Sequence, residues 1–318
     1  MNKNERKFPM STTALKILAL ILMTIDHIGA YIPDMPICLR WIGRIAAPLF
    51  FFCAAEGITH TRDKKSYLKR LWKMSMAMVL IESVLPPLAE MLLSVKISGF
   101  DNNIFLSIFQ GTLVVYLLEE SKGDKIKRAK YIFGYVWYQL ALLIVYVIWE
   151  NFDPISALGL YGLPILCDLQ RFVFTALGSV LCMEGSIILT SVIVLFYLCR
   201  DSKKRLAVSY SIYCIAYFII FVPQLPLKAV YLMGSIGVPY PIIQLFSTLC
   251  TLLGFNAIFS AGDFTQSLLY VNFQWFMIFA LPFMLMYNSE KGRGLKNLFY
   301  VYYPLHLVLL YTIGAFLR

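Results

Sequence analysis

The sequence predicts an all-α protein, a polytopic integral membrane bundle of about ten transmembrane helices forming a single transmembrane domain over residues 1–318. Only 14% of the residues are charged and 59% are hydrophobic, with a mean hydropathy of +0.71. Soluble domains carry about 25% charged residues. Apolar runs of roughly 20 residues recur along the chain, and that length allows a helix to cross a bilayer. The short alternating segments that are typical of a transmembrane barrel do not occur.

The first five predicted helices are bounded by prolines or by basic loops. The basic N-terminal segment 1–12 is followed by no small-residue cleavage site, so we expect a retained first helix rather than a signal peptide. Pro33 ends this helix, Pro48 is expected to kink the second, and Pro86-Pro87 interrupts the third. Loops rich in Lys and Arg follow the second and the fourth helix. The five runs are 13–32, 41–59, 74–93, 104–118 and 131–149.

Five further apolar runs follow a weakly polar region that ends at Glu184. Basic loops follow the sixth and the ninth of the ten runs, so both loops should lie on the cytoplasmic side. Three runs lie between these loops, and three crossings cannot return the chain to the same side. We therefore expect one re-entrant segment or a local exception to the charge rule. The runs are 185–199, 206–222, 240–260, 273–287 and 298–317.

Charge and cysteine usage exclude other classes of protein. The net charge of +10 comes from short loops between apolar runs, which is the positive-inside pattern, and no nucleic-acid partner is expected. The N-terminus is expected in the cytoplasm, and the chain in the plasma or inner membrane in contact with membrane lipids. The seven cysteines have neither CxxC nor metal-ligand spacing, so no metal is expected.

Ionisable residues inside apolar runs are the candidates for function, because charge within a membrane is costly. Asp26 and His27 fall in the outer half of the first helix, and Arg44 falls near the outer start of the second. These three residues are predicted to meet at one depth. Glu56, His60 and Arg62 form a second polar group, toward the cytoplasm.

The residues assembled so far resemble the TraX family of membrane acetyltransferases. The matching stretches run from Leu15 to Ile25-Asp26-His27-Ile28-Gly29, over 39–50 with Gly43-Arg44, and over Glu56-Gly57-Ile58-Thr59-His60-Thr61-Arg62. The C-terminal stretches 281–288 and 296–306, which end in Tyr303-Pro304-Leu305-His306, also match, and 103–118 is similar with less specific residues. The middle region, 160–270, diverges from the family pattern.

This resemblance implies acetyl transfer from cytoplasmic acetyl-CoA, as donor substrate, to an amine or hydroxyl acceptor. The best-known member of the family acetylates the N-terminus of a conjugative pilin, so an acceptor peptide, a glycan or a lipid all fit. The wider group of transmembrane acyltransferases uses a membrane-embedded histidine, which suggests that role for His27. The competing function is a proton-coupled transporter or channel, since intramembrane His, Asp and Glu serve both.

Each candidate residue has a structural alternative. His27, whose ordinary pKa lies near 6.5, is expected to be the general base, with Asp26 orienting it or pairing with Arg44; alternatively these residues only hold two helices together. Arg44 is expected to bind a phosphate or to stabilise an oxyanion; alternatively, it only forms a salt bridge with Asp26.

The remaining candidates are predicted to bind the cofactor or the acceptor. His60, Arg62 and the lysines that follow would hold the CoA phosphates, with Glu56 also assigned to the cofactor site; alternatively these residues only mark the cytoplasmic side. His306 would close the site from the opposite wall, or bond a carbonyl freed by Pro304. A last group of charged residues would shape an acceptor site on the outer side, or would simply be solvated at the surface. These residues are Glu150, Asp153, Asp168, Arg171 and Glu184.

Overall fold

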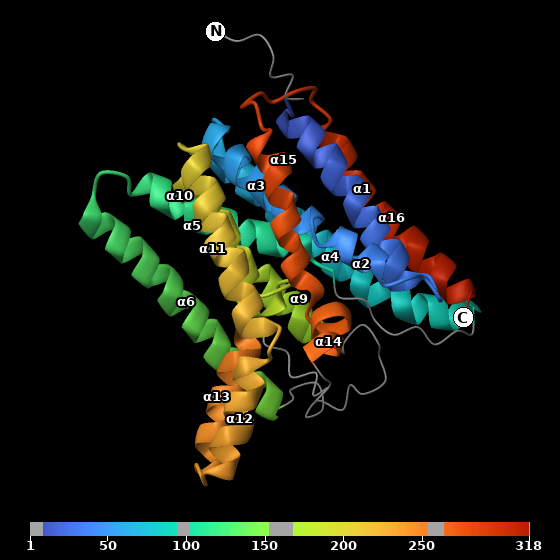
Figure 1. The fold of residues 1–318 in the computed structure, drawn as a ribbon, viewed down its shortest axis with the longest axis vertical. Coiled ribbons are helices and arrows are strands. Elements are labelled where there is room, and N and C mark those ends of the chain that lie inside the picture. Colours follow the sequence, from blue (N-terminus) through green and yellow to red (C-terminus); the bar gives the residue numbers. More distant parts are fainter. Residues whose placement is uncertain (1–8, 94–101, 153–167, 254–263, 318) are drawn as a thin grey trace. The chain divides into compact units, whose positions relative to one another are not determined.

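The computed structural model describes residues 9–93, 102–152, 168–253 and 264–317. These residues form helices and one isolated β-bridge (Figure 1), which confirms the all-α prediction. The chain divides into two compact units. Unit 1 comprises residues 1–53 and 198–318, and unit 2 comprises residues 54–197.

Unit 1 is organised around the first and the last helix, which lie side by side in Figure 1. Ser11 starts α1, because its Oγ accepts the backbone N–H of Ala14 at 3.2 Å. At the other end of α1, a Cβ added to Gly314 of α16 would lie 2.1 Å from the carbonyl oxygen of Tyr31. Only glycine permits this close approach. The helices of unit 1 are α1 (Thr12–Tyr31), α2 (Cys38–Gly43), the first part of α3 (Ala46–His60), the end of α10 (Ile187–Cys199), α11 (Lys203–Phe221), α12 (Leu225–Ser235), α13 (Tyr240–Leu252), α14 (Phe264–Gln266), η2 (Ser267–Val271), η3 (Phe273–Ala280), α15 (Leu281–Leu285) and α16 (Lys296–Phe316).

Three segment ends meet at one end of unit 1. Lys203, the first residue of α11, donates from Nζ to the carbonyl oxygens of Leu285 and Tyr287 at 2.8 and 2.9 Å. Met10, just before α1, forms the β-bridge with Tyr287. The basic loops around residues 200–205 and 291–293 therefore lie at the same end of unit 1. Among the described residues between these loops, the candidate spans are one long helix, Lys203–Ser235, and the bent pair from Phe264 to Leu285.

Unit 2 contains the longest continuous helix, α4. Asp63 starts it by accepting the backbone N–H of Ser66 at 2.9 Å, and the hydrogen bonds from Ser66 lower the pKa of this carboxyl. The predicted interruption at Pro86-Pro87 is wrong: both prolines lie inside α4. Membrane helices tolerate proline where neighbouring groups satisfy the freed carbonyls. The remaining helices are the second part of α3, α4 (Lys64–Leu93), α5 (Ile104–Glu120), α6 (Lys125–Phe152), α9 (Leu169–Ala176), η1 (Val180–Cys182) and most of α10.

The prediction of about ten spans is also wrong. Within the described ranges, six helices are long and apolar enough to cross a membrane, or seven if the segment from Phe264 to Leu285, bent by 57°, is one broken span. The described helices α10 and α13 have 13 residues each and fall short of the usual spanning length, and α5, with 17, lies at its lower limit. An apolar run in sequence measures composition only, and a shorter helix can be covered by the protein itself.

Candidate functional site

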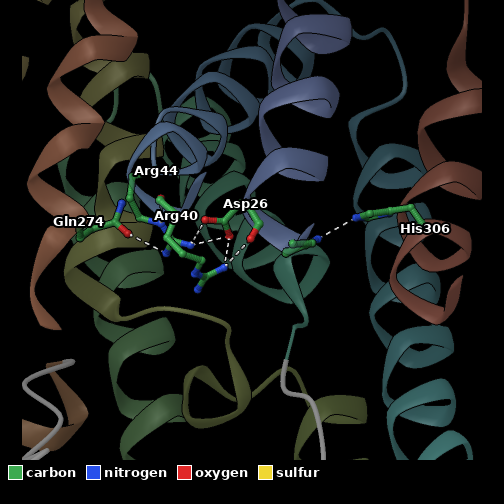
Figure 2. A network of polar contacts seen from close by, with 6 residues as sticks. Asp26, Arg40, Arg44, Gln274 and His306 are labelled. Atoms are coloured by element: carbon green, nitrogen blue, oxygen red, sulfur yellow. Dashed lines mark hydrogen bonds and ion pairs between the residues drawn. The ribbon is translucent and has the colours of Figure 1, made fainter. Parts of the chain in front are cut away.

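A carboxylate held by two arginines forms the first part of the site, within unit 1. Arg44 donates from one terminal nitrogen to both carboxylate oxygens of Asp26 at 2.5 Å. Arg40 donates to Asp26 Oδ2 at 2.6 Å and to its backbone carbonyl at 3.1 Å. Gln274 of η3 extends the group by accepting from Arg44 at 3.3 Å, as Figure 2 shows. The predicted meeting of Asp26 with Arg44 is confirmed.

The local sequence explains this close contact. Arg40 and Arg44 lie one helical turn apart, so both side chains leave the same face of α2. Gly43 stands where α2 meets α1, and a Cβ there would lie 2.1 Å from Cβ of Asp26. The predicted kink at Pro48 is instead a turn at residues 44–45, and Pro48 lies in the first turn of α3, where its missing N–H costs little.

This cluster carries excess positive charge. Two guanidinium groups surround one carboxylate, and both lie over the ring of Phe273 at 5.9 and 5.3 Å. The arginine side chains are 22–23% exposed and that of Asp26 is 8% exposed. Two guanidinium groups and one carboxylate thus lie together in a place that is partly shielded from water, an arrangement suited to stabilising an anion.

The second part of the site is a pair of buried histidines. Nδ1 of His27 lies 2.7 Å from Nε2 of His306 on α16. Nδ1 of His306 lies 2.9 Å from the carbonyl oxygen of Tyr302, one turn earlier on the same helix. Each histidine is 5% exposed. The carbonyl that Pro304 leaves without its helical donor is that of Tyr300, so the freed-carbonyl interpretation of His306 does not describe this contact.

Asp26 and His27 serve different partners, as predicted. Successive residues of a helix point about 100° apart, so Asp26 faces the arginines of α2 while His27 faces α16. In Figure 2, Asp26 and His306 lie on different sides of the helix that carries Asp26. Asp26 therefore does not orient the imidazole of His27 by direct contact.

Glu56, His60 and Arg62 belong to unit 2. His60 ends α3 with its side chain 71% exposed, and its Nδ1 lies 2.8 Å from the carbonyl of Glu56 and 3.7 Å from the Glu56 carboxylate. Arg62 is exposed. Further exposed cations follow it on α4, at Lys65, Lys69 and Lys73. The first two members of the predicted group are thus in contact, on a surface of positive charge.

The residues predicted for an outer acceptor site differ in their contacts. Arg171 is not simply solvated, because it donates at 2.6 Å to Glu82, a carboxylate whose side chain is fully buried. Glu184 contributes its backbone carbonyl to Ser107. Asp168 precedes α9 without capping it through its side chain. Asp153 and the side chain of Glu150 lie outside the described residues.

Sequence reasoning missed Arg40, Gln274 and Glu82. The signal for Arg40 was present, since it precedes Arg44 by four residues and so shares its helix face. A signal for Glu82 was also present, because it is an ionisable residue inside the apolar run 74–93. Gln274 is distant in sequence from its partner, and nothing local marks it. Within the described part of the chain, no group of three or more His, Cys, Asp or Glu residues is placed to hold a metal ion.

Comparison with known proteins adds a family and two relatives. A family model described as TraX protein matches residues 11–222. A probable fimbrial assembly protein of Dichelobacter nodosus is 37% identical over 71 residues, 21% of this chain and 29% of that protein. An uncharacterized protein of Rickettsia prowazekii (strain Madrid E) is 29% identical over 140 residues, 44% of this chain and 48% of that protein. The chain thus covers less than half the length of each relative. No solved structure matches it significantly.

Proposed function

The chain belongs to the TraX family, and on that premise we propose that it is a membrane-embedded acetyltransferase that moves an acetyl group from acetyl-CoA to an amine or hydroxyl acceptor. The observation that carries the proposal is the buried contact between His27 and His306 beside the arginine cluster. Polar contacts between membrane helices add on average only about 0.6 kcal/mol of stability. Stability alone is therefore a weak reason to bury two histidines and one aspartate and to hold two partly exposed arginines against them in this unit.

His27 is the proposed general base. It takes the proton from the acceptor N–H or O–H while the acceptor attacks the acetyl carbon. The carbon–sulfur bond then breaks, and the same proton passes to the CoA sulfur, so acetylated acceptor and free CoA thiol leave. A positioned base of this kind contributes about 10²–10⁴-fold to a rate.

Arg40 and Arg44 are the proposed source of electrostatic stabilisation. The acetyl carbonyl becomes an oxyanion during the attack, and fixed cations in a shielded place stabilise developing negative charge. Two arginines face one carboxylate, that of Asp26, and this supports the role. A cluster whose charges cancelled would attract an anion less strongly.

The exposed cations of unit 2 are the groups that we propose to bind the phosphates of the donor, acetyl-CoA. Arg62 follows His60 directly, and the lysines of α4 continue the basic surface. Lys and Arg bind phosphate through charge-assisted hydrogen bonds. Glu56 has a supporting role, since its carbonyl and its carboxylate both lie near Nδ1 of His60.

A peptide amine is the acceptor that we favour. One relative is named as a probable fimbrial assembly protein, and fimbriae are built from protein subunits. Glycan and lipid acceptors use the same base and remain outcomes of the test. The plasma or inner membrane, with the N-terminus in the cytoplasm, is the proposed location, because acetyl-CoA is a cytoplasmic metabolite and the basic loops lie at one end of unit 1.

A thermal-shift measurement in detergent tests the donor. A ligand that binds only the folded state raises the unfolding midpoint. We expect acetyl-CoA at millimolar concentration to stabilise the wild type, and the shift to weaken in Arg62→Ala. Arg205→Ala, which removes another exposed cation, is the matched control and keeps the shift. A wild type that acetyl-CoA does not stabilise contradicts the proposal.

A proton-coupled transporter is the second candidate. The bent pair of helices from Phe264 to Leu285 favours it, because broken spans mark the ion and substrate sites of many transporters. Uptake into proteoliposomes that depends on a pH gradient, without release of CoA thiol from acetyl-CoA, would favour this alternative over acetyl transfer.

A further inference from the structure

We infer that His306 is a positioning residue that fixes the tautomer of His27, so that Nε2 of His27 is the atom that takes up the acceptor's proton. The catalytic part of this inference rests on the proposed function. The tautomer itself is a property of the folded chain and can be measured without any substrate.

The assignment starts from a backbone carbonyl. Nδ1 of His306 lies 2.9 Å from the carbonyl oxygen of Tyr302. A carbonyl oxygen only accepts hydrogen bonds, so Nδ1 of His306 must carry a proton. In a neutral imidazole the other ring nitrogen then has a lone pair, and Nε2 of His306 is an acceptor.

His27 is next in the chain of hydrogen bonds. Its Nδ1 lies 2.7 Å from Nε2 of His306, and two lone pairs do not bond, so Nδ1 of His27 carries the proton. The two rings are inclined by only 15°, with centroids 5.0 Å apart. The distance between the centroids equals the Nδ1–Nε2 distance plus about two ring radii. The two rings therefore lie almost in one plane and meet edge to edge, so the lone pair on Nε2 of His306 points at Nδ1 of His27. Nε2 of His27 is left with the lone pair that a base needs.

The opposite polarity would need a charged pair. If Nδ1 of His27 were the acceptor, both nitrogens of His306 would carry protons and the ring would be an imidazolium. Both rings are buried, and the cluster across α1 already has a net positive charge from Arg40 and Arg44. Burial and nearby like charge both disfavour that form.

The same contact favours proton uptake. When Nε2 of His27 accepts the acceptor's proton, the ring becomes an imidazolium, and its Nδ1–H still points at the lone pair of His306. A hydrogen bond from a charged donor is about twice as strong as a neutral one. His306 therefore stabilises the protonated base more than the neutral base, which is what lowers a barrier.

Nitrogen NMR of the histidines tests the tautomer directly. The chain has three histidines, and His60→Ala removes the exposed one and leaves the two of interest. In ¹⁵N-histidine-labelled protein at pH 8, we expect two neutral rings, each with its proton on Nδ1. A proton on Nε2 of His27, or a charged ring at His306, in the wild type overturns the inference whatever the variants do.

Variants then separate His306 from the alternative partner. His306→Leu removes the acceptor, and we expect His27 to lose its preference for the Nδ1 proton. Asp26→Asn should leave that preference unchanged, because Asp26 contacts the arginines and not the ring. Tyr302→Phe is the matched control on α16, since it keeps the backbone carbonyl. A tautomer that follows Asp26 instead of His306 contradicts the inference.

Kinetics tests the catalytic part. We expect His306→Leu to lower kcat of acetyl transfer at least about 100-fold with KM for acetyl-CoA unchanged, and Thr312→Val, two turns further on α16, to change neither. Equal kcat in His306→Leu and wild type overturns the positioning role. An absence of transfer in the wild type refutes the proposed function instead, and the NMR result still decides the tautomer.

Discussion

Replacing Gly43 by alanine tests the arginine cluster without changing a single ionisable group. The added Cβ would lie 2.1 Å from Cβ and 2.3 Å from Oδ1 of Asp26, whereas ordinary contact begins at 3.4 Å. The two helices must therefore separate by at least 1.3 Å locally. Added to the 2.5 Å contacts with Arg44, such a shift reaches 3.8 Å, beyond hydrogen-bonding distance.

The expected cost follows from two effects. Overpacking a tight contact costs about 1–3 kcal/mol, and breaking a buried ion pair costs about 3–5 kcal/mol. The arginine side chains are about one-fifth exposed, so water and rotation recover part of the second cost. We expect a net loss of about 2–4 kcal/mol, which for a chain of this size lowers the unfolding midpoint by about 5 °C.

Thermal unfolding in detergent measures the effect. Gly134→Ala is the matched control, because a Cβ at that position in α6 meets nothing within 4 Å, and alanine in a helix is about as stable as glycine or better. Combining Gly43→Ala with Asp26→Asn adds a sharper criterion: if Gly43 acts by displacing Asp26, the double variant is less destabilised than the sum of the single ones. Additive losses, or an unchanged midpoint in Gly43→Ala, refute this explanation.

Three further predictions concern other contacts. Glu82→Gln should destabilise unit 2 by about 2–4 kcal/mol in chemical unfolding, because a neutral amide replaces the buried carboxylate that binds Arg171, and the 24% exposure of the arginine side chain recovers part of the cost. A loss no larger than that of a variant in an exposed ion pair contradicts this. The pKa of Asp63 is lowered, so its cap of α4 is present above the ordinary pKa and lost as pH falls through the lowered value. The protection of first-turn amides from exchange, relative to the intrinsic rate at each pH, should therefore fall in acid in the wild type but not in Asp63→Asn. Gly314→Ala should separate α16 from the carbonyl of Tyr31 and abolish the Nδ1 proton preference of His27 in the ¹⁵N spectrum.

The sequence predicted the class of the fold better than its count of spans. Hydropathy identifies apolar helices because it measures what a lipid or a protein interior accepts. It does not separate the two environments, and it does not measure the length of a helix, so the short helices α10 and α13 were counted as spans. The contact of Lys203 with the end of α15 places at one end two loops between which the sequence had suggested three crossings.

The parts of the site that follow from membrane depth, charge and the geometry of single helices could be predicted from the sequence. Depth and charge brought Asp26 to Arg44, and the helical angle separated Asp26 from His27. Pairing between His27 and His306 needed the packing of the first helix against the last, which depends on glycine at 314 and on contacts 279 residues apart in sequence. No local pattern encodes such a contact, although both residues stood out as charge-bearing groups in apolar runs.

Adjacent placement of Asp26 and His27 has a physical consequence for the chemistry. A carboxylate in contact with an imidazole would favour the imidazolium, and a base that is already protonated cannot accept a proton. Here Arg40 and Arg44 bind the carboxylate of Asp26, and the contact of Nδ1 of His27 is with the ring of His306. In the mechanism that we propose, the base is therefore free of a carboxylate that would favour its protonated form, while fixed positive charge lies one residue away. The contact of His27 with His306 instead of Asp26 suits that role, and Asp26→Asn should leave the tautomer of His27 intact even as it destabilises the cluster.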